Sequence, residues 1–418
     1  MRVLQVNAGD IVGVRFNNYG IKDLLAERGV DSRHLVWNRL SDDPAVGKIF
    51  DYPGSRRLND AVRRLERDLS IHSTLQLHSF ALPLQKVFRE ADLVHYHIVH
   101  DGYFSLMAMP LLSRLKPTVW TWHDPWPMTG HCIYPLECER WKTGCGACPA
   151  LDLVFPMKRD RTALQFRQKR WIIPSSKLEV VLASRFMMDM ARQSPIARDL
   201  RLTHIPFGID LGRFKPGPSE AARRRLGIFE GRTVIGVRAF EGSPYKGFEY
   251  FVEALEKLNT EKPLAIVTTH AKGGLNKFIG QHQIIELGWV NDDQTMLDTY
   301  MAADFFVMPS LAEAFGMMAI EAMACGKPVI VFEGTSLPEV AFTPEVGIAV
   351  PMRDSEALAG AISRLIDDGA EVAVRGERGR RVAVEHYDAR LFARRLAELY
   401  ARVSARKPAS QPITGAAA

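Results

Sequence analysis

The chain has 418 residues, of which 47% are hydrophobic and 24% are charged, and its formal net charge is +6. This length is too great for one ordinary core and predicts two domains of about 200 residues each, with the composition of a globular enzyme. No run of about 18 apolar residues occurs, which excludes a bilayer-spanning helix, and Met1–Asn7 reads as a strand rather than a signal peptide, so we expect a cytoplasmic protein.

Short runs rich in Val, Ile and Leu alternate with helical patterns along most of the chain, which indicates parallel sheets with helices on both faces. The strands predicted in the first half are Arg2–Asn7, His34–Trp37, Leu93–His97, Thr118–Trp122 and Glu179–Ala183. Those predicted in the second half are Thr233–Val237, Leu264–Thr268, Ile284–Leu287, Phe305–Met308 and Pro328–Phe332. The predicted fold class is α/β, with two Rossmann-like domains.

A segment rich in Pro and Gly, residues 205–218, is the best candidate for a linker between the two domains. It predicts an N-terminal domain over residues 1–205 and a C-terminal domain over 206–385. A helix is expected over about 386–404, where it packs back on the N-terminal domain, and the tail over 405–418 is expected to be disordered.

Two stretches of the first half, residues 56–67 and 158–171, are rich in Arg and Lys. With the net positive charge they suit an anionic partner, either a peripheral contact at the inner membrane or a polyprenyl-diphosphate-linked acceptor. Ordinary solvated helix faces are the alternative. The sequence holds no helix-turn-helix, zinc-finger or RNA-binding signature, so we expect no nucleic-acid partner.

Four of the five cysteines fall within seventeen residues, at Cys132, Cys138, Cys145 and Cys148. The spacing of the last two, Cys-x2-Cys, suits a tetrahedral metal site, and in a reducing compartment it predicts structural zinc. Disulfide or redox use and unligated thiols are the alternatives.

Residues 308–330 read as a strand, a turn, a buried helix, a Gly stop and the next strand. Ligands of open α/β sheets bind at the carboxyl ends of the strands, where helix N-termini point. Glu313 lies in the turn and Glu321 follows eight residues later, so both carboxylates are able to face one cleft. The alternative is a capping Glu313 with a buried, hydrogen-bonded Glu321.

This stretch closely resembles the signature of the retaining glycosyltransferases of family 4, which have the glycosyltransferase B fold. The shared pattern is Glu, a small residue, Phe-Gly, a second Glu eight residues after the first, and then Ala-Met-Ala-x-Gly-x-Pro-Val. Ala314 stands where Gly is commoner. The resemblance implies two Rossmann-like domains that face each other across a cleft, the first binding the acceptor and the second a nucleotide-sugar donor.

By the same resemblance, Glu313 contacts hydroxyls of the donor sugar and Glu321 binds the nucleotide ribose. Backbone N–H groups at the helix start face the diphosphate; they belong to Phe315, Gly316, Met317 and Met318. Arg238, just past the first strand of the second domain, and Lys246, where Lys-Gly opens a helix, match the family's cations, which stabilise a departing diphosphate. Surface charges are the alternative for both.

In the N-terminal half, His123 ends a predicted strand at the place where the family has a His that contacts the donor sugar. Gly13 lies in the loop where the family brings the backbone close to sugar and phosphate; a turn glycine is the alternative. The cysteine segment resembles one found in family 4 enzymes of bacterial exopolysaccharide synthesis, which implies a role in making surface glycans.

The predicted function is therefore the transfer of a sugar, with retention at the anomeric carbon, from a nucleotide diphosphate to a glycan or lipid-linked oligosaccharide. Lys246, Arg238 and the helix end stabilise the leaving diphosphate, while Glu313 and His123 position the sugar. No cofactor is required for catalysis, because side-chain cations and a helix dipole take the place of a metal. A nucleotide-sugar 2-epimerase and a non-catalytic glycan-binding protein are the alternatives.

Overall fold

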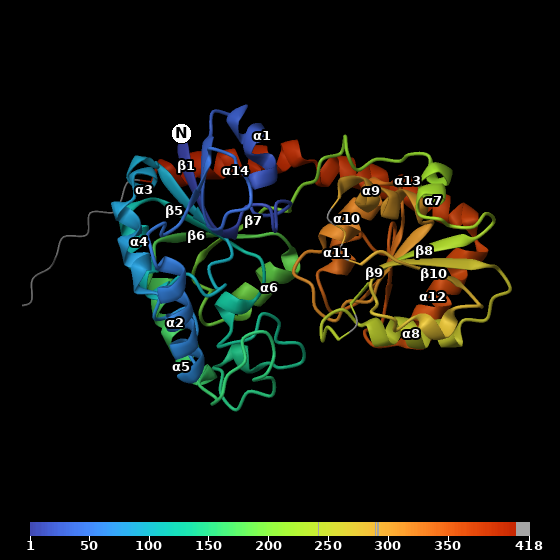
Figure 1. Ribbon diagram of the computed structural model, residues 1–418, viewed down its shortest axis with the longest axis horizontal. Coiled ribbons are helices and arrows are strands. Elements are labelled where there is room, and N and C mark those ends of the chain that lie inside the picture. The colour runs from blue at the N-terminus through green and yellow to red at the C-terminus, as the bar shows by residue number, and fades with distance from the viewer. Residues whose placement is uncertain (241, 289, 291, 407–418) are drawn as a thin grey trace, which may run out of the picture. The chain divides into compact units, whose positions relative to one another are not determined.

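The computed structural model describes residues 1–240, 242–288, 290 and 292–406. The chain divides into two compact units (Figure 1). The first unit comprises Met1–Leu182, Ala191–Thr203 and the segment from Ala393, and the second comprises Ala183–Met190 and His204–Phe392. From residue 407 onward, the tail that the sequence predicts to be disordered lies outside the described residues.

The first unit is built on a seven-stranded sheet. Its strands are β1 (Arg2–Gly9), β2 (Asp31–Asn38), β3 (Val46–Lys48), β4 (Leu93–Tyr96), β5 (Thr118–Trp122), β6 (Leu178–Leu182) and β7 (Arg201–His204). Their spatial order is β3-β2-β1-β4-β5-β6-β7, and the pairs from β3 to β6 are parallel. The winding direction therefore changes between β1 and β4, which makes that point the expected place for ligands.

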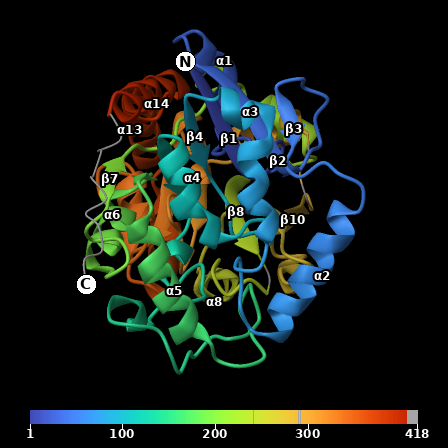
Figure 2. The ribbon, with the colours of Figure 1, turned by 90° about the vertical axis from the view of Figure 1, so that its left-hand side faces the viewer.

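Helices complete this unit. They are α1 (Lys22–Ala26), α2 (Ser55–Asp68), α3 (Lys86–Glu90), α4 (Met109–Leu115) and α5 (Thr162–Ser175), with short 3-10 helices η1 (Tyr19–Ile21), η2 (Leu77–Leu84), η3 (Leu106–Ala108), η4 (Trp126–Met128) and η5 (Arg140–Lys142). The next helix, α6 (Arg185–Gln193), belongs to the second unit up to Met190 and to the first from Ala191. Figure 2 shows α3, α4 and α5 on the near face of the sheet. Every residue of β4, β5 and β6 is buried, as strands covered on both faces require.

The second unit is built on a six-stranded sheet in which the neighbouring strands are parallel. Its strands are β8 (Thr233–Phe240), β9 (Leu264–His270), β10 (Gln283–Glu286), β11 (Phe305–Met308), β12 (Val329–Phe332) and β13 (Ile348–Val350). The order is β10-β9-β8-β11-β12-β13, so the winding direction changes between β8 and β11.

The helices of this second unit follow the same alternation. They are α7 (Ser219–Arg225), α8 (Phe248–Lys257), η6 (Asn276–Phe278), α9 (Asp293–Ala302), α10 (Met317–Ala324), α11 (Leu337–Val340), α12 (Ser355–Asp367) and α13 (Gly369–His386). Phe248, Phe251 and Leu255 of α8 are buried, as their helical spacing predicts. Among the described residues, no helix combines the length and apolar character that crossing a membrane requires.

The last helix, α14 (Ala389–Ser404), lies beside β1 of the first sheet (Figure 1). The Tyr400 hydroxyl lies 3.3 Å from Nε2 of Gln5, 395 residues away in the sequence, and Ser404 contacts the sulfur of Met1. The predicted α/β fold with two parallel sheets is confirmed. The short strands β3, β7 and β13 were not predicted.

Candidate functional site

In the second unit, two loops flank the point where the strand order reverses. One leads from β8 to α8 and ends in Lys246-Gly247; the other leads from β11 to α10 and carries Glu313. The loops are joined through their backbones, because the Tyr245 carbonyl accepts hydrogen bonds from the N–H groups of Leu311 (2.9 Å) and Ala312 (3.3 Å).

Lys246 and Glu313 meet between these loops. The Lys246 ammonium (Nζ) lies 2.6 Å from Oε2 of Glu313, and the two side chains are 18% and 17% exposed. Both groups are thus largely buried yet still reachable from solvent. The structure brings together two residues, 67 positions apart in the sequence, that were predicted independently.

The backbone around Glu313 is held from two further segments. The Ser336 hydroxyl lies 3.0 Å and 3.1 Å from the carbonyl oxygens of Glu313 and Phe315, and the Ser184 hydroxyl donates to the carbonyl of Ala314 at 2.7 Å. These bonds fix the loop without using its N–H groups. The Ala319 N–H donates to the Gly316 carbonyl at 3.0 Å, so the N–H groups that precede it at the start of α10 are the ones placed to bind an anion.

Gly316 begins α10 in a conformation that only glycine adopts easily, with φ of 99°. A Cβ at this position would lie 2.4 Å from Cδ2 of Leu337, so a side chain has no room there. The Phe315 ring packs edge-on against Phe207 and Tyr387, which anchors the turn in the core. Met317 and Met318 then start the helix. Whether a diphosphate binds these four residues stays a prediction.

Glu321 lies on α10 and is fully buried. The Tyr300 hydroxyl donates a hydrogen bond of 2.5 Å to its Oε2. Its carboxylate therefore does not share the solvent access of Glu313, and this geometry matches the buried, hydrogen-bonded alternative. Its role toward a ribose stays a prediction.

Arg238 lies near the end of β8 and is partly buried. Among the described residues it forms no salt bridge, and no contact joins it to the pair of Lys246 and Glu313. The structure thus brings Lys246 and Glu313 into direct contact, without a direct bond from Arg238 to either of them among the described residues. Its role at a diphosphate also stays a prediction.

In the first unit, the strand register lines up a layer of polar side chains. Gln5 of β1 pairs with His34 of β2 on one side and with His95 of β4 on the other. His97 follows β4, and its Nε2 lies 2.9 Å from Oε1 of Gln5. The other ring nitrogen of His97, Nδ1, lies 3.1 Å from Nε2 of His123, just beyond β5.

These contacts indicate which ring nitrogen of His123 is protonated. Burial lowers the pKa of His97 well below its usual range and that of His123 to about 4, so both rings are neutral near pH 7. Nε2 of His97 has two polar neighbours, the Gln5 amide oxygen at 2.9 Å and the Asn18 amide nitrogen at 3.4 Å, and the shorter contact favours Nε2 as the donor and Nδ1 as the acceptor. His123 therefore holds its proton on Nε2, and its Nδ1 is an acceptor.

The layer extends to the C-terminal helix. Tyr400 of α14 places its hydroxyl 2.7 Å from Nδ1 of His95, whose Nε2 lies 2.8 Å from the hydroxyl of Thr121. Asn18 contacts the same Tyr400 hydroxyl at 3.2 Å. Gln5, Asn18 and Tyr400 were not among the predicted site residues. For Gln5 the signal existed, since an amide inside an otherwise apolar strand needs buried partners.

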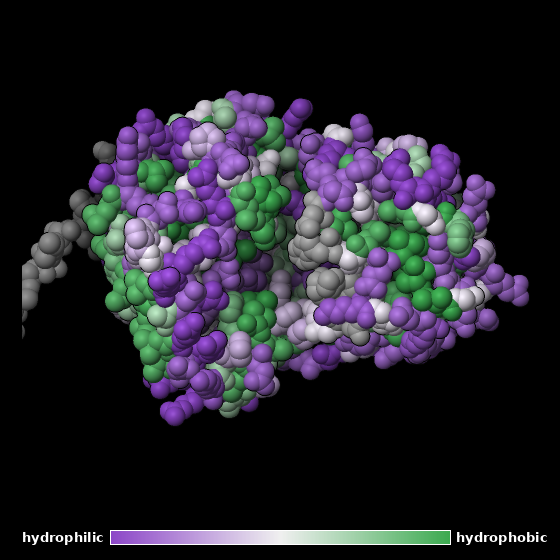
Figure 3. Space-filling model, in the orientation of Figure 1, coloured by the Kyte–Doolittle hydropathy of each residue, from purple (hydrophilic) through white to green (hydrophobic). Residues whose placement is uncertain are grey.

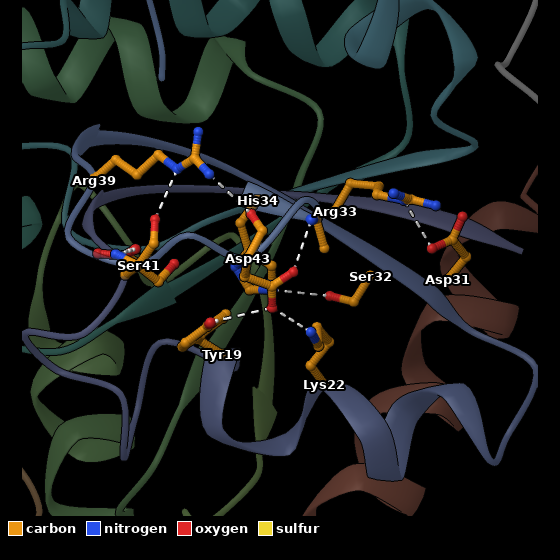
Figure 4. A network of polar contacts seen from close by, with 11 residues as sticks. Tyr19, Lys22, Asp31, Ser32, Arg33, His34, Arg39, Ser41 and Asp43 are labelled. Atoms are coloured by element: carbon orange, nitrogen blue, oxygen red, sulfur yellow. Dashed lines mark hydrogen bonds and ion pairs between the residues drawn. The ribbon is translucent and has the colours of Figure 1, made fainter. Parts of the chain in front are cut away.

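Gly13 lies in the loop after β1 with φ of 84°, and a Cβ there would lie 2.8 Å from the ring of Phe16. The Phe16 ring is in turn 5.1 Å from that of His123. Further along the chain of the same unit, Asp43 contacts Lys22 and the Tyr19 hydroxyl, as Figure 4 shows. The turn explains Gly13 structurally, and contact with a donor stays a prediction.

The four clustered cysteines line one cavity of about 20 Å³, together with His131 and Trp141. All four are free thiols, and burial raises the pKa of Cys132 to about 12 and raises the pKa values of Cys145 and Cys148. Across the described residues, no group of three His, Cys, Asp or Glu side chains is arranged to hold a metal ion. The predicted structural zinc is thus not supported, and the geometry favours neutral thiols.

A buried cation lies next to this cluster. Lys169 of α5 donates to the carbonyl oxygens of Trp126 (2.7 Å) and Thr129 (2.9 Å), and its Nζ lies 3.4 Å from the centre of the Trp126 ring. Burial lowers its pKa to about 7. Lys169 thus ties α5 to the segment after β5, and its contacts are structural.

Comparison with known proteins gives the family. The model for "Glycosyl transferases group 1" matches residues 231–368. A D-inositol 3-phosphate glycosyltransferase of Mycobacteroides abscessus is 33% identical over 393 residues, which cover 91% of this chain and 82% of that protein. This chain belongs to the group 1 glycosyltransferases. A relative of the same name from Corynebacterium jeikeium is 26% identical to this glycosyltransferase over 88% of the chain and 87% of that protein.

Solved structures agree on the fold of this glycosyltransferase. Sucrose-phosphate synthase from Thermosynechococcus elongatus superposes with a TM-score of 0.65 at 18% identity, covering 96% of this chain and 99% of that one. HepE of Anabaena in complex with UDP gives 0.64 at 16% identity, covering 96% and 100%. The fold is the glycosyltransferase B fold.

Proposed function

We propose that this glycosyltransferase moves a sugar from a nucleotide-diphosphate donor to a hydroxyl of a glycan or lipid-linked oligosaccharide, with retention at the anomeric carbon. The donor binds at the loops after β8 and β11. The observation that carries the proposal is the pair formed by Lys246 and Glu313 where the strand order reverses.

The pair suits an exchange of partners when the donor arrives. The diphosphate attracts Lys246, whose ammonium neutralises the charge that develops as the sugar–oxygen bond breaks. Glu313 is then released from its ion pair and accepts hydrogen bonds from sugar hydroxyls. Because both side chains are partly exposed, this exchange needs no unfolding of the loops.

The start of α10 supplies the second electrostatic element. Gly316 lets the chain enter the helix without a side chain, and the N–H groups from Phe315 to Met318 are at its positive end. We propose that they bind the diphosphate. The resemblance to family 4 adds Arg238 at the diphosphate, Glu321 at the ribose and Gly13 in the loop near the sugar and phosphate.

His123 is proposed to contact the donor sugar as well. Its Nδ1, fixed as an acceptor by His97, is able to receive a hydrogen bond from a sugar hydroxyl. A neutral ring is required for this, and the lowered pKa of His123 keeps the ring neutral above about pH 5.

For the acceptor, we propose a growing glycan of bacterial surface or exopolysaccharide synthesis, made at the inner face of the membrane. The support is the resemblance of the cysteine segment to enzymes of that subgroup. The named relatives act on D-inositol 3-phosphate, which makes a phosphorylated polyol the second candidate acceptor.

The proposal is tested by single substitutions assayed after screening a panel of nucleotide sugars for thermal stabilisation. Lys246→Ala and Glu313→Ala should each reduce transfer at least about 100-fold while leaving the folded fraction unchanged. The matched control is Lys277→Ala, which breaks an exposed ion pair with Glu256 elsewhere in the same unit and should retain activity. Full activity of either site variant would remove the assignment.

Incubation with donor alone separates transfer from epimerisation. A transferase hydrolyses its donor slowly at most, whereas a 2-epimerase converts the sugar without an acceptor. Binding of a nucleotide diphosphate with no turnover under any acceptor would instead indicate a non-catalytic glycan-binding protein.

A further inference from the structure

A cavity of about 360 Å³ lies in the first unit, well apart in sequence from the donor loops. One wall is the C-terminal half of α2 and the residues after it, and the other is the segment 154–157. The first of these segments overlaps the basic stretch 56–67, and the second directly precedes the basic stretch 158–171. They are joined by an ion pair of 2.6 Å between Lys158 and Asp68 and by the Arg159 N–H, which donates to Ser70.

Three arginines of α2 line the cavity: Arg63, Arg64 and Arg67. All three are exposed, and Arg63 interacts electrostatically with Asp101 and Arg67 with Asp68, but among the described residues none of the three forms a salt bridge or hydrogen bond. Arg63 lies against Gly102, where a Cβ would be 2.8 Å from its Nε. In Figure 3, hydrophilic side chains run down the surface where Figure 1 places α2.

The acidic residues of the wall do not cancel this charge. Glu66 is buried and its carboxylate accepts N–H bonds from Thr74 (2.7 Å) and Leu75 (2.6 Å), so it is used in holding the chain. Asp60 lines the cavity as an exposed carboxylate, and Asp101, beside Gly102, interacts electrostatically with Arg63, so two carboxylates stand against three guanidinium groups. The cavity therefore carries net positive charge.

The opposite wall is apolar, and ring stacking supports it. Phe155 stacks on the ring of His72, with centroids 4.2 Å apart, and Val154 and Met157 lie beside it. Burial lowers the pKa of His72 to about 3, so this ring is neutral and the positive charge comes from the arginines. A planar guanidinium suits a phosphate better than an ammonium does, because it donates two parallel hydrogen bonds.

The cavity connects to the strand ends near His123. Nε2 of His72 lies 2.5 Å from the carbonyl oxygen of His100, and the ring of His100 lies 3.1 Å from the carboxylate of Asp124. Asp124 is the neighbour of His123 in the chain. The cavity thus belongs to the carboxyl edge of the first sheet, where α/β proteins bind their ligands.

We propose that this cavity binds a phosphate group of the acceptor, so that the substrate glycosylated by this enzyme is a phosphorylated one. This inference rests on the proposed function and adds the chemical class of its acceptor. A lipid diphosphate and a soluble phosphate monoester share the recognised group. The alternative is that these arginines only form a solvated face of α2.

The first test measures binding of inorganic pyrophosphate by calorimetry. It uses the full chain carrying Lys246→Ala, which removes the donor-site cation. Adding Arg64→Gln and Arg67→Gln should weaken pyrophosphate binding about tenfold or more. The matched control, Arg56→Gln with Arg57→Gln, removes the same charge from the same helix at a separate cavity, which these two residues line with Lys48, and should leave binding unchanged if the phosphate site is the cavity of Arg64 and Arg67. Equal weakening by both pairs, or no binding at all, would overturn the proposal.

Displacement then distinguishes the two sources. A short-chain isoprenyl diphosphate and a soluble inositol monophosphate are each titrated against bound pyrophosphate, and the stronger competitor identifies the class. Vesicles containing phosphatidylglycerol are the third arm. If both arginine pairs reduce vesicle binding equally and neither soluble phosphate competes, the arginines contact a membrane surface and the cavity is not a phosphate site.

Kinetic measurements distinguish a failure of the phosphate-binding proposal from a failure of the proposed function. With Lys246 intact, Arg64→Gln with Arg67→Gln should raise the KM for acceptor about tenfold and leave donor hydrolysis unchanged. An absence of transfer by the unmodified enzyme with every donor would refute the proposed function, while the pyrophosphate result would still decide the nature of the cavity.

Discussion

Gly247 and Pro309 approach each other so closely that a Cβ on Gly247 would lie 2.0 Å from the Pro309 carbonyl oxygen. This contact joins the loop after β8 to the loop after β11, backbone against backbone. Gly247 also has φ of 58°, in the left-handed region. The ion pair of Lys246 with Glu313 therefore depends on the absence of a side chain at the next position.

Gly247→Ala should consequently separate the loops. We expect a loss of about 2–3 kcal/mol in the free energy of unfolding of the second unit and a fall in transfer of about 100-fold, as Lys246 moves from Glu313. Urea unfolding followed by circular dichroism, with activity measured in parallel, checks both.

Gly242→Ala is the control for this prediction. Gly242 has φ of 79° but open space around its position, so the substitution carries backbone strain without a collision. It should cost only about 1 kcal/mol. If the two variants behave alike, the contact with Pro309 has no special role.

The sequence predicted the separate parts of the candidate site better than their assembly. Lys246 and Glu313 were predicted from two separate motifs. Their contact depends on β8 lying beside β11, and neither motif predicts the order of the strands. For Glu321 the local pattern left two readings open, a cleft shared with Glu313 or a buried, hydrogen-bonded carboxylate, and the geometry matches the second. Its burial against Tyr300 follows from the packing of α9 and α10, which local spacing does not reveal.

The polar layer of the first unit illustrates the same limit. His123 was predicted from its place at a strand end, whereas Gln5 and Tyr400 meet across 395 residues. Only the register of β1 against β4 places Gln5 next to the histidines. For the cysteines, closeness in sequence predicted more than the structure supports. The four thiols line one cavity, but among the described residues they are not arranged to hold a metal ion.

The tautomer of His123 provides a second prediction. Gln5→Met removes the oxygen that accepts from His97, so the proton of His97 is free to move to Nδ1 and the proton of His123 to its own Nδ1. We expect transfer to fall about tenfold, mainly through kcat. Nitrogen-15 shifts of the histidine rings should show the change of tautomer directly.

Thr121→Val is the matched variant for this layer. It removes the hydroxyl next to His95 but leaves the contacts of His97 and His123 intact. It should keep the His123 tautomer and most of the activity. A Gln5→Met enzyme with unaltered ring shifts would refute the proton arrangement, whatever its activity.

The third prediction concerns acid sensitivity of the first unit. Burial and, to a smaller extent, the charge of Lys22 lower the pKa of His34 from 6.5 to about 4, against the opposing effect of Asp43 and Asp10. Between pH 6.5 and 4 the unfolded chain therefore binds a proton that the folded chain does not. The free energy of unfolding must fall as the pH drops through this window and is fully retained above pH 6.5.

For His34 alone, this difference amounts to about 2–3 kcal/mol between pH 7 and pH 4.5. His34→Gln should reduce the pH-dependent loss by that amount, even if it lowers stability at pH 7, because the glutamine does not titrate. Six of the seven tryptophans lie within residues 37–171, so their fluorescence during urea unfolding reports on this unit. The control is His386→Gln in the second unit, which should leave the loss reported by these tryptophans unchanged. A His34 variant with the original pH dependence would show that His34 takes up its proton in the folded chain.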